Sequence, residues 1–295
     1  MAEIDLPAIL LVDKPEGPTS HDVIRIARRH LDTRRIGHTG TLDPFASGLL
    51  LLCLGAATRL VEYFHLLPKT YTATAALGAE TDSEDRTGAV TRRSEAWRVV
   101  TEGEIEQAAA GLRGPSAQVP PSYSALKVDG RRAYEVARAG GDVALEPRAV
   151  EVHRFEVTGI RLPEVDLLTE VSTGTYVRSL ARDFGRALGC GAHLKTLRRE
   201  SIGPFRVNDA VDLLDLEAGE IPECAVISPV DALSWLPVRT LTPCETAEIE
   251  HGRRIRDPHG PDGSDLPVAL VAGERLVAVA RREACELQPE KVFHV

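Results

Sequence analysis

The stretch from Gly37 to Gly48 constrains the fold more than any other part of the sequence. It reads Gly-His-Thr-Gly-Thr-Leu-Asp-Pro-Phe-Ala-Ser-Gly, and its glycines allow sharp turns and a close approach of the backbone to a ligand. Asp43 precedes a proline, which favours extended backbone over helix at that position. The apolar run 49–54 follows at once and predicts a strand buried on both faces. The sequence therefore predicts a carboxylate on a shaped loop that a core strand anchors.

The wording of this loop closely resembles the signature of the TruB family, the bacterial tRNA pseudouridine-55 synthases. The resemblance implies that Asp43 is the catalytic residue and nucleophile and that His38 contacts the substrate. An aspartate in a glycine-rich loop is by itself more often a turn residue than a catalyst. The remaining motifs therefore have to support the assignment independently.

Two further motifs lie on either side of the loop. Leu-Val-Asp-Lys-Pro at 11–15 resembles the first family motif and makes Lys14 a substrate-binding candidate, although a surface turn with a solvated lysine is an equal alternative. The pair Lys69 and Tyr71 resembles the second motif. A tyrosine can stack on a flipped base and offer its hydroxyl to the reaction. The alternative for Tyr71 is a core tyrosine on a strand.

A third motif, Gly-Thr-Tyr-Val-Arg, opens a segment with helical apolar spacing from 177 to 188. Thr175 is the expected N-cap and Gly189 the expected C-cap. Arg178 would then lie in the first turn, where the helix dipole opposes a cation, so a compensating carboxylate is expected nearby. The resemblance implies that this partner is Asp43. Such a pair would keep Asp43 ionised and aimed.

The substrate-binding candidates are completed by Tyr176 of the third motif and by the segment 191–200. The resemblance implies that Leu197 packs against the target base and that Arg198 and Arg199 contact phosphates. A core leucine beside two solvated arginines is the alternative.

The other elements predict a mixed α/β (α+β) chain. A helix capped by Thr19 or Ser20 has an apolar stripe and an opposite face rich in arginine, which either meets RNA phosphates or is solvated. The acidic turn 81–88 does not fit a calcium loop. Strands are expected at 9–12, 72–77 and 165–171, and helices at 56–66 and 101–112. The resemblance implies a pseudouridine-synthase fold with a central, largely antiparallel sheet.

The chain is expected to divide into a catalytic domain, residues 1–235, and a small β domain, residues 236–295. A hairpin around Gly273 supports the second domain, which resembles PUA-like barrels. The segment 120–148 is basic and carries Tyr123 and Tyr134. The resemblance implies an insertion that closes over RNA as a lid, and a plain helical insertion is the alternative.

Charge and composition narrow the class of protein. The net charge of −9 is unusual for a nucleic-acid binder, but the acidity is segregated. Segments 21–70 (seven basic, four acidic, +3) and 176–206 (seven basic, two acidic, +5) are basic, whereas 207–233 holds seven acidic residues and no basic one (−7). Five dispersed cysteines and the lack of a long apolar run indicate a reducing, cytoplasmic setting without a zinc site or membrane span.

The implied reaction breaks the bond from ribose C1′ to uracil N1, turns the base and joins C1′ to C5. It needs neither metal nor redox cofactor, and Asp43 either attacks the substrate covalently or removes a ribose proton. The implied partner is the T-arm of tRNA, bound by a monomer. An RNA-binding module without chemistry and a nucleotide hydrolase are the competing classes, and the loop lacks a P-loop signature that would favour the second.

Overall fold

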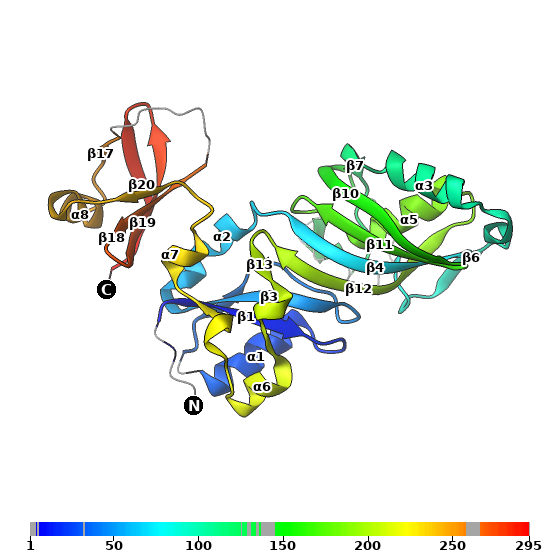
Figure 1. Ribbon diagram of the computed structural model, residues 1–295, viewed down its shortest axis with the longest axis horizontal. Coiled ribbons are helices and arrows are strands. Elements are labelled where there is room, and N and C mark those ends of the chain that lie inside the picture. Colours follow the sequence, from blue (N-terminus) through cyan, green and yellow to red (C-terminus); the bar gives the residue numbers. More distant parts are fainter. Residues whose placement is uncertain are drawn as a thin grey trace.

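The computed structural model describes residues 4, 6–31, 33–124, 126–128, 131–133, 136, 145–257 and 266–294. Most strands join one large sheet, and a separate five-stranded sheet follows near the C-terminus. Figure 1 shows the large sheet running through the body of the molecule, with the C-terminal sheet set to one side of it. The mixed α/β class and the C-terminal β unit predicted from the sequence are thereby confirmed.

The large sheet is mostly antiparallel, with parallel pairing only between β1 and β14 and between β3 and β12 among the described strands. Its main path is β14 (Val211–Asp212), β1 (Ala8–Lys14), β3 (Ser47–Leu54), β12 (Ala192–Ile202), β4 (Lys69–Leu77), β11 (Glu164–Val171), β10 (Arg148–Arg161) and β7 (Gly114–Gln118). Off this path, β2 (Ile36–His38) pairs with β3, β13 (Phe205–Arg206) with β12, and β15 (Val226–Ile227) with β1. Two short hairpins are separate: β5 (Ala79–Thr81) with β6 (Val90–Arg93), and β8 (Lys127–Val128) with β9 (Arg131–Arg132).

The described helices are short. They are α1 (Ser20–His30), α2 (Val61–Phe64), α3 (Glu102–Gly111), α5 (Val177–Ala187), α6 (Leu213–Ala218), α7 (Pro229–Ala232) and α8 (Pro243–Glu250). Among them, no helix has the length and apolar character that crossing a bilayer would require.

The strand that anchors the glycine-rich loop is β3, and the prediction for it is confirmed. Its residues from Gly48 to Leu54 are all buried, because β1 and β12 flank it and apolar clusters cover both of its faces. A strand in this position cannot shift without exposing leucines to water, at roughly 1.5–3 kcal/mol each. The loop that precedes it therefore starts from a fixed support.

Some of the helix ends and helix types predicted from the sequence are confirmed, and others are wrong. Thr19 caps α1 in a reciprocal capping box with Asp22, as expected from the sequence. The expected N-cap of α5, Thr175, is wrong by one residue, because Tyr176 occupies the N-cap and makes no side-chain cap bond there. The helix expected over 56–66 is also wrong in type. That segment begins as a 3₁₀ helix (Gly55–Leu60) and has only one α-helical turn, α2.

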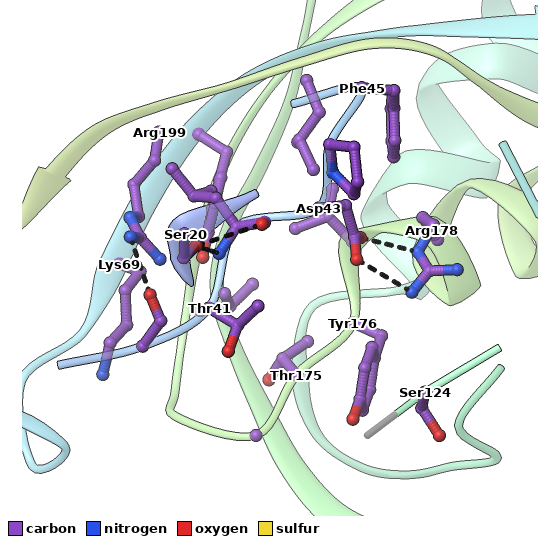
Figure 2. Close-up of a pocket in the computed structure, with 18 of the residues that line it drawn as sticks. Ser20, Thr41, Asp43, Phe45, Lys69, Ser124, Thr175, Tyr176, Arg178 and Arg199 are labelled. Atoms are coloured by element: carbon purple, nitrogen blue, oxygen red, sulfur yellow. Dashed lines mark hydrogen bonds and ion pairs between the residues drawn. The ribbon is translucent and has the colours of Figure 1, made fainter. Parts of the chain in front are cut away.

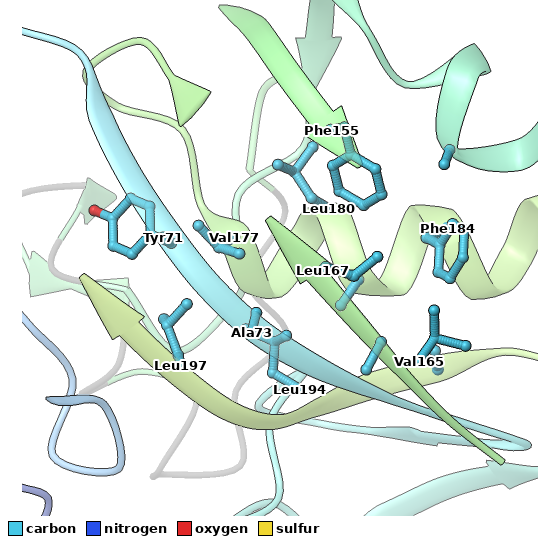
Figure 3. Packing of buried hydrophobic residues seen from close by; sticks show 14 of the residues in the cluster. Tyr71, Ala73, Phe155, Val165, Leu167, Val177, Leu180, Phe184, Leu194 and Leu197 are labelled. Atoms are coloured by element: carbon cyan, nitrogen blue, oxygen red, sulfur yellow. The ribbon is translucent and has the colours of Figure 1, made fainter. Parts of the chain in front are cut away.

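A hydrophobic cluster between the sheet and helices α5 and α3 supports the site from behind. Phe184 and Leu180 of α5 are buried in one cluster with Leu167 and Ala73 of the strands, and Figure 3 shows these residues together. Phe155 and Phe184 pack with ring centroids 5.8 Å apart. Since these groups are buried together, the helix that carries Arg178 is fixed against the strand that carries Tyr71.

The C-terminal sheet has the order β16 (Val238–Thr240), β18 (Val268–Ala272), β19 (Arg275–Glu283), β20 (Glu286–Val292) and β17 (Ile255–Arg256). Its Val271, Leu276 and Phe293 belong to the same buried cluster as Phe64 and Leu236 of the preceding chain. The sheet is thus packed onto the rest of the protein by apolar contacts. The exact boundary between 235 and 236 stays a prediction.

Candidate active site

A cavity of about 950 Å³ opens where the glycine-rich loop meets the start of α5 and strands β4 and β12. Seven of the eight site residues predicted from the sequence line it: His38, Asp43, Lys69, Tyr71, Tyr176, Arg178 and Leu197. The eighth, Lys14, is not part of its wall. Residues as far apart in the chain as Ser20 and Arg199 therefore meet at one site, shown in Figure 2.

The centre of the cavity is the pair formed by Asp43 and Arg178. Arg178 Nε lies 3.0 Å from Asp43 Oδ2, and its Nη2 donates to Oδ1 at 3.4 Å, as the dashed lines in Figure 2 show. The guanidinium is 5% exposed and the carboxylate side chain 35% exposed. The arginine therefore belongs to the wall, whereas the carboxylate faces the open space.

Two opposing effects act on Asp43. Removal from bulk water raises the pKa of its carboxyl above the ordinary value of 3.8, while the Arg178 cation lowers it, and Asp85 raises it further. Burial is the larger effect. Arg178 therefore opposes a rise in the pKa of Asp43 that burial in the cavity causes, and that the pair keeps Asp43 ionised stays a prediction.

This balance predicts the pH dependence of the activity. If the reaction needs the ionised carboxylate, activity is lost as pH falls through the raised pKa of Asp43. The acid limb of the pH–rate profile, where activity falls with pH, should then lie at a higher pH than an ordinary aspartate would give. Arg178→Gln removes the cation that lowers this pKa, so the acid limb should move to higher pH. Single-turnover rates across pH measure it.

The matched control is Arg186→Gln on the same helix. Arg186 pairs with Glu80 at 2.7 Å and is 54% exposed, and it does not line the cavity. Its acid limb should coincide with that of the wild type. An Arg178→Gln limb at or below the wild-type position would contradict the electrostatic assignment.

Arg178 is itself held by groups that sequence reasoning did not assign. It donates to the backbone carbonyls of Ser83 at 2.8 Å and Tyr123 at 2.9 Å. Asp85 lies 3.7 Å from its Nη1, and Asp85 is fixed by bonds from the Ser83 hydroxyl and the Thr87 backbone. The acidic turn 81–88 thus holds the Arg178 guanidinium in place. The concentration of short polar residues in this turn is the sequence signal that could have indicated this role.

The loop that carries Asp43 is clamped at several points. The Leu42 N–H donates to the Ser20 hydroxyl at 2.9 Å, and that hydroxyl donates to the Leu42 carbonyl at 3.2 Å. Ser20 begins α1, so the helix start fixes the residue before Asp43. Sequence reasoning had considered Ser20 only as a helix cap.

Arg199 forms a second clamp, and the predicted phosphate contact is not its role in this structure. Its Nε donates to the Leu49 carbonyl at 2.7 Å and its Nη2 to the Gly40 carbonyl at 3.2 Å. It is 2% exposed. The guanidinium therefore joins the two ends of the loop. Arg198, on the other face of β12, is occupied by Asp13 at 3.0 and 2.6 Å.

The pair of neighbouring arginines provides a matched test. We expect Arg199→Met to lower the turnover rate by about tenfold or more, because a loose loop misplaces Asp43. Arg198→Met should change it less than about twofold, since a partly exposed ion pair contributes little. Turnover and RNA affinity measured for both variants check this. Equal effects of the two substitutions would contradict the clamp.

The floor of the cavity holds further buried basic groups. Lys69 donates to the Leu67 carbonyl at 2.6 Å and to the Thr173 hydroxyl, and burial lowers its pKa to about 8, with Arg199 adding to the shift. Burial and Arg199 likewise lower the pKa of His38. The His38 Nδ1 accepts from the Gly40 N–H at 3.3 Å, so the neutral ring carries its proton on Nε2. No carboxylate pairs with Lys69 among the described residues.

Lys14 differs from both interpretations of its motif. It is fully buried, and it donates to the carbonyls of Pro15 at 2.8 Å and Pro18 at 2.9 Å. Burial lowers its pKa to about 8, and the Asp43 charge acts in the opposite direction. It is therefore neither a solvated turn lysine nor part of the cavity wall, and it shapes the turn behind the loop.

The apolar part of the wall comes from Tyr71 on β4, Leu197 on β12 and Tyr176 before α5. Tyr71 and Leu197 are buried on adjacent strands, and Figure 3 shows them at the same end of the hydrophobic cluster. Aromatic and aliphatic surfaces of this kind suit a flat base. Much of the predicted lid, including Tyr134, lies outside the described residues.

The described residues contain no group of three or more His, Cys, Asp or Glu side chains that could hold a metal ion. The site consists of a carboxylate, a paired guanidinium, buried basic groups and an aromatic wall. Such a set can hold a neutral planar ring next to an activated carboxylate. It can act on the ring or on an attached sugar by nucleophilic or general-base chemistry.

Comparison with known proteins identifies the family. Residues 28–177 match the TruB family pseudouridylate synthase N-terminal domain, and residues 178–234 match the tRNA pseudouridylate synthase B C-terminal domain. A protein named tRNA pseudouridine synthase B from Thermobifida fusca is 43% identical, covering 97% of this chain and 98% of the relative. One of the same name from Mycobacterium leprae is 41% identical, covering 98% and 91%.

Solved structures agree in fold. A chain from an H/ACA RNP bound to a substrate RNA containing 2′-deoxyuridine aligns with a TM-score of 0.74 at 26% identity, covering 98% of this chain and 85% of that chain. A chain from a Cbf5-Nop10-Gar1 complex also has a TM-score of 0.74, at 28% identity and 97% and 85% coverage. With the paired carboxylate at the centre of the same fold, this chain belongs to the TruB family of pseudouridylate synthases and is an isomerase.

Proposed function

We propose that this protein converts uridine to pseudouridine at position 55, in the T-loop of tRNA, and that Asp43 acts on the everted nucleotide. The observation that carries the proposal is the Asp43–Arg178 pair at 3.0 Å in a cavity of about 950 Å³. This volume exceeds that of a single nucleobase. The relatives named tRNA pseudouridine synthase B support tRNA as the substrate.

The residues have distinct tasks in this proposal. The bond between ribose C1′ and uracil N1 breaks, and its electron pair stays with the base. The Asp43 carboxylate either bonds to C1′ or takes a ribose proton. C5 of the turned base then bonds to C1′, and the carboxylate leaves C1′ or, on the second route, returns its proton to the ribose. C5 loses its proton to water, and N1, which kept the electron pair, gains a proton. Tyr71 and Leu197 hold the ring, and the nearby cations Arg199 and Lys69 favour the negative charge that the base acquires.

Eversion of a uridine costs stacking energy, which contacts in the cavity must offset. His38 ends β2 and lines the cavity, and its lowered pKa favours the neutral ring near pH 7, so it can enter the stack without desolvating a charge. The arginine-rich face of α1 begins beside His21, which also lines the cavity. Phosphates on either side of the everted nucleotide would meet this face.

We further propose that the protein acts as a single chain in the cytoplasm. The catalytic carboxylate and the wall residues named above all come from one polypeptide. One of the similar solved structures is a Cbf5-Nop10-Gar1 complex, so the mass of the active form needs its own measurement. Light scattering of the active protein, alone and with RNA, should give the mass of one chain.

The substrate assignment is tested with tRNA transcripts. The purified protein is incubated with an unmodified transcript and with one in which the T-loop uridine is replaced by cytidine. Pseudouridine is then mapped by its mass shift after chemical labelling. We expect one modified position in the first transcript and none in the second. Modification at other uridines with the T-loop uridine untouched would contradict the proposal.

A further inference from the structure

Gln118 is a buried polar residue to which no role has yet been given. It ends strand β7 and is 4% exposed. Its side-chain Nε2 donates to the Tyr176 carbonyl at 3.1 Å, and the Tyr176 N–H donates to its Oε1 at 2.8 Å. One amide thus satisfies both backbone groups of a residue 58 positions away. This is the pairing that a neighbouring strand would otherwise supply.

Tyr176, which this amide holds, lies between the cavity and the start of the helix that carries Arg178. Tyr176 lines the cavity and is the N-cap of α5, with extended backbone and no side-chain cap bond. Its carbonyl also accepts the first helical bond, from the Leu180 N–H at 3.1 Å. Arg178 follows two residues later. Figure 2 shows Tyr176 and Arg178 beside Asp43 at the same end of the cavity.

The residues after Gln118 attach to the same helix. The Val119 carbonyl accepts from Arg182 Nη2 at 3.1 Å, and the Tyr123 carbonyl accepts from Arg178 Nη2 at 2.9 Å. Arg182 is also paired with Glu84. The segment 118–123 therefore contacts α5 and its N-cap at three residues. Of these three contacts, only the one made by Gln118 uses a side chain of the segment itself.

We propose that Gln118 is a positioning residue for the isomerisation, which sets the Tyr176 ring and the Arg178 guanidinium against Asp43. The inference rests on the proposed function of this cavity. Without the amide, the Tyr176 N–H loses its partner and the Tyr176 carbonyl keeps only the Leu180 N–H, so the start of α5 shifts to find other partners. Misplacement by about 1 Å at a reacting centre costs on the order of a hundredfold in rate.

Gln118→Glu tests the proposal, because the two protonation states of the new side chain should differ in the hydrogen bonds that they make. A carboxylate can still accept from the Tyr176 N–H but repels the Tyr176 carbonyl, whereas a protonated carboxyl can donate to that carbonyl and regain both bonds. We expect turnover at pH 8 to fall by about tenfold, with KM changed less than about twofold. The variant-to-wild-type ratio of turnover should rise as pH is lowered towards 6.

The ratio separates positioning from other effects. Protonation of Asp43 lowers the turnover of both proteins, so its effect largely cancels in the ratio. A new negative charge that acted only by raising the pKa of Asp43 would instead make the ratio fall at low pH. A flat or falling ratio therefore overturns the proposal. The matched control is Gln107→Glu on α3, where the side chain is exposed and the ratio should stay near one.

Gln118→Met supplies the second variant, because it keeps the length of the side chain but can neither donate nor accept strongly. Its turnover should be lowered at every pH, without recovery, and wild-type turnover would overturn the proposal. If the wild type itself forms no pseudouridine, the proposed function fails. If the wild type is active and both Gln118 variants match it, only this inference fails.

Discussion

Asp43→Asn is expected to lower the single-turnover rate of pseudouridine formation by about a thousandfold or more, because positioned acid–base or nucleophilic groups contribute on this scale. The substitution keeps the shape of the side chain and removes its charge. Arg178 keeps Asp85 and the carbonyls of Ser83 and Tyr123 as partners, so the wall should remain in place. RNA affinity should stay within about threefold of wild type.

The rate is measured as release of tritium from RNA labelled at uracil C5, the hydrogen that the new carbon–carbon bond replaces. Asp209→Asn, an exposed carboxylate after β13, is the control and should react like the wild type. An Asp43→Asn protein that retains a tenth of wild-type activity would remove Asp43 from the chemistry.

Gly48→Ala is expected to have the second largest effect, on stability and activity together. Gly48 has φ of +104°, and an added Cβ would lie 2.3 Å from the backbone carbonyl oxygen of Arg199. The two residues are register partners in the parallel pair of β3 and β12, so neither backbone can move freely. Left-handed strain and overpacking each cost about 1–3 kcal/mol.

The strand and the loop would have to separate to relieve this contact, which would also pull Arg199 away from Gly40. We therefore expect the free energy of unfolding to fall by about 3 kcal/mol or more and turnover to fall about a hundredfold. Gly103→Ala on α3 is the control, because its Cβ meets nothing within 4 Å. Equal melting curves for the two variants would contradict the close approach.

Part of the site could be predicted because its sequence contains strong local signals, one of which is a cation at an unfavourable helix position. An arginine in the first turn of a helix required a carboxylate, and the structure contains that ion pair between Arg178 and Asp43. The apolar run after Gly48 predicted a doubly buried strand, and β3 is one. Strong local patterns were therefore sufficient for these elements.

Other features depend on distances between segments that no local pattern encodes. Strand alternation puts Arg198 and Arg199 on opposite faces, but it does not say which face the loop covers, so both were interpreted as phosphate contacts. The bond pair between Gln118 and Tyr176 spans 58 residues and follows from the meeting of β7 with α5. The raised pKa of Asp43 likewise follows from the depth of the cavity.

The central claim is that the cavity between Asp43 and Tyr71 receives an everted uridine. A crystal structure of Asp43→Asn bound to a T-arm RNA hairpin tests it most directly, because the inactive side chain should trap the substrate. We predict the target base against Tyr71 and its C1′ atom about 3–3.5 Å from the side chain at position 43. A uridine that stays stacked in the hairpin, or lies in another part of the protein, would contradict the account.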